Sequence, residues 1–206
     1  MGFSVAEQAY NLTLAKKDRY WNLVDSSVSY QREALNSLYL QWEGKPLNLP
    51  GLRFLDIACG SDNNSEKNPP IFARWLATQG ANVVGIDAGS NDPEFNDAYQ
   101  HIVQFLPVDS SFSLRDFLNN HGVTDLFDII YSNKAFSPTN PSPSIPGYIE
   151  ERETFGIKMI DQLQEWAPQV LKPNGYLIIL DVRGKGIWRN SRSGLERLGF
   201  APPLRR

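Results

Sequence analysis

The arrangement of apolar residues from position 52 onward is the feature that most constrains the fold of this chain. Apolar runs of strand length alternate there with segments of helical periodicity. Such alternation is typical of a parallel sheet whose crossover connections place helices on both faces. It predicts an α/β fold with a doubly wound, mainly parallel sheet. The expected strands are 52–57, 82–86, 102–106, 127–131 and 176–182, and the expected helices are 69–79, 93–99, 113–120 and 149–171.

The region before this alternation shows only helical spacing. Apolar and aromatic residues recur over residues 4–43 at the intervals of an amphipathic helix, which predicts two N-terminal helices. The total length of 206 residues suits one domain with a substantial core. We therefore expect a single domain over 1–206, with a helical segment at 1–46 and the α/β core at 50–206.

The composition excludes several classes of site. The single cysteine, Cys59, excludes an internal disulfide, and with only two histidines, His101 and His121, we expect no metal. No apolar run is long enough to cross a membrane, and the N-terminus lacks the apolar centre of a signal peptide. These observations predict a soluble cytoplasmic protein that does not contact membranes.

The turn after the first strand carries the first functional signal. Ligands of such sheets bind outside the carboxyl ends of the strands. The turn reads DIACGSD, so G-x-G-x-x-G is absent and Ala58 stands where a glycine is often found. Asp56 precedes the turn, and Asp62 and Glu66 follow it. Carboxylates there would repel a pyrophosphate, which favours a glycine loop leading into a helix N-terminus. The turn therefore favours a cationic ligand over a dinucleotide.

Two further acidic residues follow the next strands. Asp87 ends the second strand in VVGIDAG, where a carboxylate can accept hydrogen bonds from both ribose hydroxyls. Asp109 follows the third in LPVDSS, where it could accept a hydrogen bond from an adenine amine. S-adenosylmethionine carries an ammonium, a sulfonium, a ribose and an adenine, and no phosphate. It fits this set of strand ends better than a dinucleotide does.

Five stretches of the chain, in this order, resemble class I S-adenosylmethionine-dependent methyltransferases with the Rossmann-like fold. They are LDIACG, VVGIDAG, PVDSS, FDIIYSN and LKPNGYLIILDV, and they span about residues 52–182. The resemblance implies strand order 3-2-1-4-5, S-adenosylmethionine as cofactor and methyl transfer as activity. It also implies cofactor-binding roles for Asp56, Ala58, Cys59, Gly60, Ser61, Asp87, Ala88, Asp109, Ser110, Ser132 and Asn133.

The resemblance leaves the catalytic residues open. The sulfonium is already an activated leaving group, so alignment and desolvation of the nucleophile can supply much of the acceleration and we name no general base. Tyr131, Asn133 and Lys134 would lie beside the acceptor. The N-terminal aromatic residues either form a lid over the cofactor or only pack the helices on the sheet. They are Tyr10, Tyr20, Trp21 and Tyr30.

Three of the residues that the resemblance assigns to cofactor binding could instead have a purely structural role. Asp56 could simply tie down its turn, and Asp109 could cap the helix that starts at Ser113. We interpret Cys59 as a small packed residue and not a nucleophile, because no basic residue adjoins it. The proline-rich segment 136–147 either encloses a substrate or serves as a plain connector.

The chain departs from the family at three places. The connection after the first strand is extended by SDNNSEKNPP, and the fourth strand is followed by SNKAF, without the N/D-P-P-Y pattern of amino-methylating members or the carboxylate cluster of metal-dependent ones. The chain also ends soon after the fifth strand, where Pro202 and Pro203 interrupt the remainder. We therefore expect a shortened C-terminal edge, and because uncovered edges pair readily, a possible homodimer.

The charge distribution keeps more than one acceptor open. The formal net charge is −3, but residues 183–206 hold seven basic residues and one acid, which gives +6 against −9 for the remainder. A small-molecule methyl acceptor is the primary prediction. The alternatives are RNA or another polyanion as acceptor, with nucleic acid the less favoured partner, and a catalytically degenerate member that binds only cofactor or a partner protein.

Overall fold

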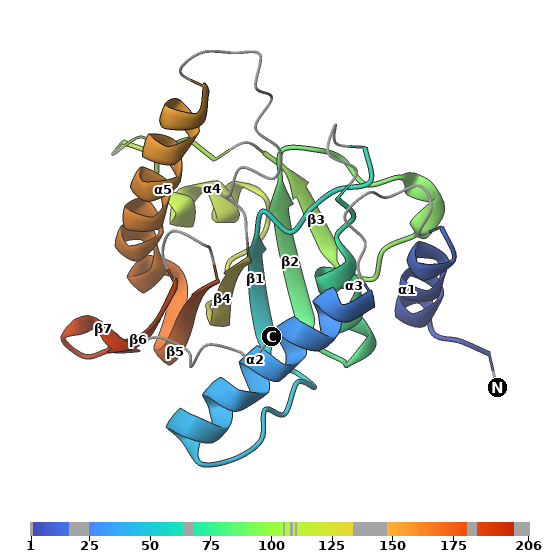
Figure 1. The fold of residues 1–206 in the computed structure, drawn as a ribbon, viewed down its shortest axis with the longest axis horizontal. Coiled ribbons are helices and arrows are strands. Elements are labelled where there is room, and N and C mark those ends of the chain that lie inside the picture. Colours follow the sequence, from blue (N-terminus) through green and yellow to red (C-terminus); the bar gives the residue numbers. More distant parts are fainter. Residues whose placement is uncertain are drawn as a thin grey trace. The chain divides into compact units, whose positions relative to one another are not determined.

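The computed structural model describes most of the chain (Figure 1). The described residues fall into two compact units, the first ending at Phe105 and the second beginning at Leu106. The expectation of a single domain over 1–206 stays a prediction. The described ranges are 2–16, 25–63, 68–104, 106–107, 109, 111–133, 148–180 and 185–199.

The first unit holds three parallel strands. β2 pairs with β1 on one side and with β3 on the other, and both pairings are parallel. Asp56 of β1 lies opposite Gly85 of β2, and Asp87 of β2 lies opposite Val103 of β3. The carboxyl ends of all three strands therefore meet at one edge. The elements are α1 (Val5–Ala15), α2 (Asp25–Glu43), β1 (Arg53–Ile57), α3 (Ile71–Thr78), β2 (Asn82–Asp87), the short 3₁₀ turn η2 (Pro93–Phe95) and β3 (Gln100–Val103).

Two helices of the first unit begin in different ways. Ser4 caps α1 through a capping box, in which its hydroxyl accepts from the Glu7 backbone N–H at 3.2 Å and the Glu7 carboxylate accepts from the Ser4 N–H at 2.7 Å. α3 begins after Pro70 without a side-chain cap. Asn68, which precedes the two prolines, does not cap this helix, and its carbonyl accepts from the Ser61 N–H at 2.8 Å.

The second unit combines parallel and antiparallel strands. β4 and β5 pair in parallel, and β5, β6 and β7 pair in antiparallel fashion. The inner residues of β4 and β5 are buried, as both-face burial in a doubly wound sheet requires. The elements are α4 (Leu114–Asn120), β4 (Phe127–Asn133), α5 (Tyr148–Val170), β5 (Leu171–Leu180), β6 (Lys185–Ser191) and β7 (Gly194–Gly199).

The strand order is β3-β2-β1-β4-β5-β6-β7. The predicted order 3-2-1-4-5 is therefore confirmed, and it is that of the Rossmann-like methyltransferase fold. The expected shortening of the C-terminal edge needs correction, because the hairpin β6–β7 follows β5. Its strands mix charged and apolar residues, so they lack the continuous apolar run that identifies the inner strands. Homodimerisation stays a prediction.

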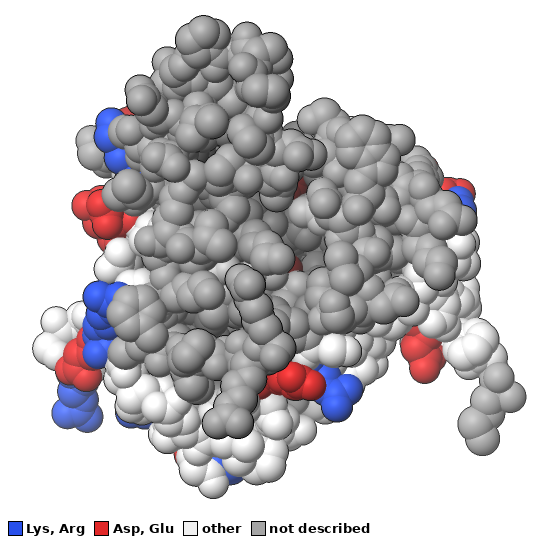
Figure 2. Space-filling model, viewed as in Figure 1, with Lys and Arg blue, Asp and Glu red and all other residues white. Residues whose placement is uncertain are grey.

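The helices and the surface charges bear on possible contacts with membranes and polyanions. Within the described ranges, no helix is both long and apolar enough to cross a membrane. On the face drawn in Figure 2, the described Lys and Arg side chains lie near Asp and Glu side chains and form no continuous basic patch.

Candidate functional site

The turn after β1 is held in a conformation that its sequence only partly predicts. Ala58 and Gly60 both have left-handed backbone, with φ of 56° and 91°. A Cβ on Gly60 would lie 2.5 Å from the Asn68 carbonyl oxygen, so only glycine fits there. The backbone N–H of Ala58 donates to the Ile86 carbonyl at 2.8 Å, which ties the turn to the end of β2.

Asp87 closes this turn. Its Oδ2 accepts from the Gly60 N–H at 3.1 Å, and its Oδ1 accepts from the Ser61 hydroxyl and the Gly89 N–H, both at 3.0 Å. A carboxylate offers about four acceptor positions, so these three bonds leave capacity for a further donor. Asp87, which the sequence predicts to bind a ribose, therefore also stabilises the turn. Sequence reasoning missed this structural role. Ala88, which follows Asp87, is exposed.

Asp56 lies in the same unit, but it is buried. The residue is 3% exposed, and within the described ranges no group donates a hydrogen bond to its carboxyl. Burial raises the pKa of its carboxyl well above the ordinary value, and the negative charge of Asp87 adds to this. The alternative that Asp56 ties down the turn is not supported, because Asp87 makes those bonds.

Cys59 belongs to a small polar cluster beneath the turn. Its Sγ lies 3.7 Å from His101 Nδ1, and the Tyr99 hydroxyl lies 3.4 Å from the same nitrogen. His101 Nε2 lies 2.9 Å from the Gly89 carbonyl oxygen and must carry a proton to donate to it. Burial of the thiol raises the pKa of Cys59 well above its ordinary value, and the charges of Asp56 and Asp87 add to this. The premise that no basic residue adjoins Cys59 is wrong, because His101 lies beside its thiol. The raised pKa nevertheless agrees with a packed residue and not a nucleophile.

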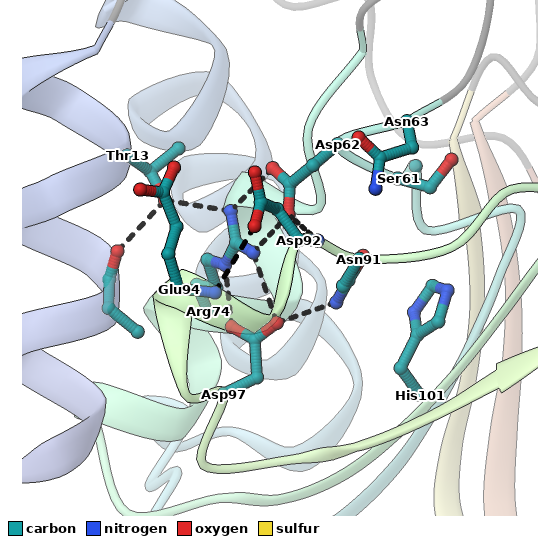
Figure 3. Close-up of polar contacts among 12 residues, drawn as sticks. Thr13, Ser61, Asp62, Asn63, Arg74, Asn91, Asp92, Glu94, Asp97 and His101 are labelled. Atoms are coloured by element: carbon teal, nitrogen blue, oxygen red, sulfur yellow. Dashed lines mark hydrogen bonds and ion pairs between the residues drawn. The ribbon is translucent and has the colours of Figure 1, made fainter.

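Asp62 does not face a ligand as the sequence suggests, because an arginine neutralises it. Arg74 of α3 donates to both Asp62 oxygens, at 3.0 and 2.6 Å, and to both oxygens of Asp97, at 2.6 and 3.0 Å (Figure 3). Its fifth donor contact is to the Thr13 hydroxyl of α1, at 2.8 Å. We call Arg74, Asp62, Asp97 and Thr13 the Arg74 cluster. The acidic charge at Asp62 therefore no longer argues for a cationic ligand.

The predicted residues of the second unit have their own surroundings. Asp109 is exposed, and its Oδ1 accepts from the Ser111 N–H at 2.8 Å and the Ser111 hydroxyl at 2.9 Å. These bonds lower the pKa of Asp109. The cap of α4 is Ser113 itself, so the suggestion that Asp109 caps this helix is wrong. Ser110 lies outside the described residues.

The end of β4 holds polar atoms that are buried without a partner. Ser132 is 1% exposed, and neither its Oγ nor Asn133 Oδ1 has a hydrogen-bond partner among the groups that the structure describes. Native interiors leave few such atoms, and a bound ligand or an ordered water is one common partner for them. Lys134 and the segment 136–147 lie outside the described residues, as do Tyr20 and Trp21.

Sequence reasoning missed the Arg74 cluster, although one signal was available. Arg74 stands within IFARWLAT, a helix in which the other five of the first six residues are apolar and buried. A basic residue in that position needs a buried acidic partner. The partners themselves, Asp62 and Asp97, could not be read from the sequence because they come from other loops.

Among known proteins, only solved structures resemble this chain, and they do so at low sequence identity. No model of a known protein family matches the chain, and neither does any curated protein. A solved structure of the plantazolicin methyltransferase BpumL with bound S-adenosylhomocysteine (SAH) matches with 16% identity and a TM-score of 0.42, over 86% of this chain. The chain spans 56% of that protein, about half its length.

Two other matches are similar in strength. The Burkholderia thailandensis 1,6-didemethyltoxoflavin-N1-methyltransferase, with its substrate and SAH bound, matches with 15% identity and a TM-score of 0.36, over 98% of this chain and 76% of that one. A 2-haloacrylate reductase matches with 16% identity and a TM-score of 0.38, over 84% of this chain and 39% of that one. Because the matches include methyltransferases and a reductase at low TM-scores, they do not select an activity.

Proposed function

We propose that this protein is an S-adenosylmethionine-dependent methyltransferase that acts on a small-molecule acceptor. The observation that carries the proposal is the form of the turn after β1. Asp87 closes this turn, and α3 begins only at Ile71, after Pro69 and Pro70. A dinucleotide would need a helix N-terminus directly after the turn to hold its pyrophosphate. A ligand that carries a ribose and no phosphate needs none.

The described residues supply groups suited to such a ligand. In the first unit, Asp87 keeps capacity to accept from a ribose hydroxyl, and the backbone of residues 58–61 would border the amino-acid part of the cofactor. Asp56 would lie near that part. Bound S-adenosylmethionine supplies an activated methyl group. The chain's own contribution would be to orient the cofactor and exclude water.

The acceptor is assigned to the end of β4. Ser132 Oγ and Asn133 Oδ1 are buried without a described partner, so an acceptor that donates a hydrogen bond to Asn133 would satisfy an atom that is now unpaired. An uncharged or weakly charged small molecule fits this better than a polyanion. The basic residues of the hairpin, among them Arg189, Arg192 and Arg197, lie in strands and a turn together with Glu196.

Calorimetric titration tests the proposal. SAH should bind to the wild-type protein, and NADH should not. Asp87→Asn should weaken SAH binding about tenfold or more, because the amide loses an anionic acceptor and disturbs the turn. Asp128→Asn is the matched control, since Asp128 pairs with Lys172 at a part-exposed position of the second unit. It should leave SAH affinity unchanged.

Several outcomes would contradict the proposal. Absence of SAH binding at about 1 mM, where even a weak site would be occupied, would exclude a cofactor role. NADH binding tighter than SAH binding would favour an oxidoreductase. Transfer of labelled methyl groups to low-mass compounds in a cell extract should follow cofactor binding, and transfer only to RNA would reassign the acceptor.

A further inference from the structure

Arg74 uses its whole hydrogen-bonding capacity inside the first unit. The residue is 1% exposed, and its five N–H donors make five contacts of 2.6–3.0 Å with Asp62, Asp97 and Thr13. Both carboxylates are held in bidentate fashion. Desolvation opposes the charge of the guanidinium, but hydrogen bonds to Asp97 and Asp62 outweigh it, so the pKa of Arg74 is raised. Lysine could not reproduce this geometry.

The Arg74 cluster joins two loops at the carboxyl ends of the strands. Asp62 follows the turn after β1, and its Oδ2 also accepts from the Asp92 N–H at 3.1 Å. Asp97 lies between η2 and β3, and its Oδ2 also accepts from the Asn91 amide at 2.6 Å. The Asn63 N–H donates to the Ser90 carbonyl at 3.1 Å. The segments after β1 and β2 are therefore fixed to each other.

The same cluster lies next to the turn that Asp87 closes. Ser61 precedes Asp62 directly, is fully buried, and donates its hydroxyl to Asp87. A displacement of Asp62 would therefore move Ser61 and disturb one of the three bonds that Asp87 makes. This connects Arg74 to the proposed cofactor site without any contact of Arg74 with the cofactor.

The N-terminal helix α1 docks on these elements. Thr13 is fully buried, and its hydroxyl accepts from Arg74 while donating to the Ala9 carbonyl at 2.9 Å. Ala9 packs against Phe95 of η2, whose ring lies 4.0 Å from the Arg74 guanidinium carbon. Lys16 at the end of α1 forms an ion pair with Glu94 of η2. Arg74 therefore contacts α1 and both loops at once, beside the separate Ala9–Phe95 and Lys16–Glu94 contacts.

We infer that Arg74 is a positioning residue that couples the docking of α1 to ligand binding at the turn closed by Asp87. The inference rests on the proposed function for the identity of the ligand. Coupling of this kind is reciprocal: if docked α1 favours the binding-competent turn, the bound ligand must favour docked α1 by the same free energy.

Thr13→Val tests the coupling because it removes one acceptor of Arg74 and leaves both ion pairs with Asp62 and Asp97 in place. We expect SAH binding by calorimetry to weaken at least about fivefold. Thr13→Ser keeps the hydroxyl and should restore wild-type affinity. Thr78→Val is the matched control, since the Thr78 hydroxyl bonds the Trp75 carbonyl of its own helix, at 2.7 Å, outside the Arg74 cluster. It should not change the affinity.

Amide hydrogen exchange of α1 provides a second measurement. If Thr13 only stabilised the fold, its substitution would not change how the exchange responds to SAH. SAH should slow the exchange of the α1 amides in the wild-type protein, and this ligand-dependent protection should shrink in Thr13→Val. The inference is overturned if SAH binds equally to both proteins, or if α1 exchange does not respond to SAH, even when Thr13→Val lowers the melting temperature. A wild-type protein that does not bind SAH refutes the proposed function instead, and the inference with it.

Discussion

The strand ends of the two units differ in how their polar groups are satisfied. In the first unit, Asp87, Asp62 and Asp97 each hold several described donors, so the loops after β1 and β2 are internally fixed. In the second unit, Ser132 Oγ and Asn133 Oδ1 at the end of β4 are buried with no described partner. The first arrangement is preorganised, and the second has unused hydrogen-bonding capacity. This difference suits the proposed function, in which the first unit holds the cofactor in a preformed turn and the acceptor completes the hydrogen bonding at the end of β4.

The largest expected effect tests how far the first unit depends on Arg74. Arg74→Met leaves two buried carboxylates without their partner, so the free energy of unfolding should fall by about 3–5 kcal/mol in urea denaturation. Lys172→Met is the control, because Lys172 and Asp128 pair at 41% and 22% exposure and such pairs contribute about 1 kcal/mol or less. Equal losses in the two variants would refute the contrast.

Gly60→Ala tests the fixed turn itself. A side chain there meets left-handed backbone strain and a Cβ position 2.5 Å from the Asn68 oxygen, so unfolding free energy should fall by about 3 kcal/mol. Gly122→Ala carries the strain alone, with φ of 75° and open space around the Cβ, and should cost about 1 kcal/mol. If chemical denaturation gives the same loss for both, the turn is not packed as described.

Two buried serines should respond in opposite directions. Ser61→Ala removes a hydroxyl that donates to Asp87 and should destabilise the protein by about 1 kcal/mol. Ser132→Ala removes a buried hydroxyl without a described partner and should be neutral or stabilising by about 1 kcal/mol. Thermal unfolding of the two variants without ligand checks the signs, and a loss of stability in Ser132→Ala would mean that the hydroxyl has a partner.

An effect of similar size, which disappears at low pH, concerns Asp56, whose carboxyl in the first unit has no described hydrogen-bond donor. Its folded pKa is raised above the ordinary 3.8, so its contribution to stability is complete below pH 3.8 and is lost as the pH rises through the raised pKa. Asp56→Asn should therefore be about 1 kcal/mol more stable than wild type at pH 7, with the difference vanishing toward pH 3.8.

Asp109→Asn is the control of opposite sign for this pH dependence. The folded pKa of Asp109 is lowered, so its contribution is present above pH 3.8 and is lost as the pH falls through the lowered pKa. Denaturation curves for both variants across this pH range separate the two cases. A stability difference for Asp56→Asn that does not change with pH would mean that Asp56 is not held protonated.

The sequence by itself predicted most of the alternation of elements and the acidic residues at the carboxyl ends of β1 and β2, because local periodicity marks strands and helices. The strand order came from the family resemblance of its motifs, and the helix expected over 93–99 is only the short 3₁₀ turn η2. The hairpin β6–β7 escaped this reasoning, because its partly exposed strands carry charged residues among the apolar ones.

Only the tertiary structure decided which acidic residues remain available. Asp62 is 12 residues from Arg74, Asp97 is 23 residues away and Thr13 is 61 residues away, so no local pattern predicts their meeting. The Gly60 and Ser61 bonds to Asp87 likewise join residues 27 and 26 positions apart. A carboxylate is the same in sequence whether it awaits a ligand or holds a loop, and only its neighbours in space distinguish the two.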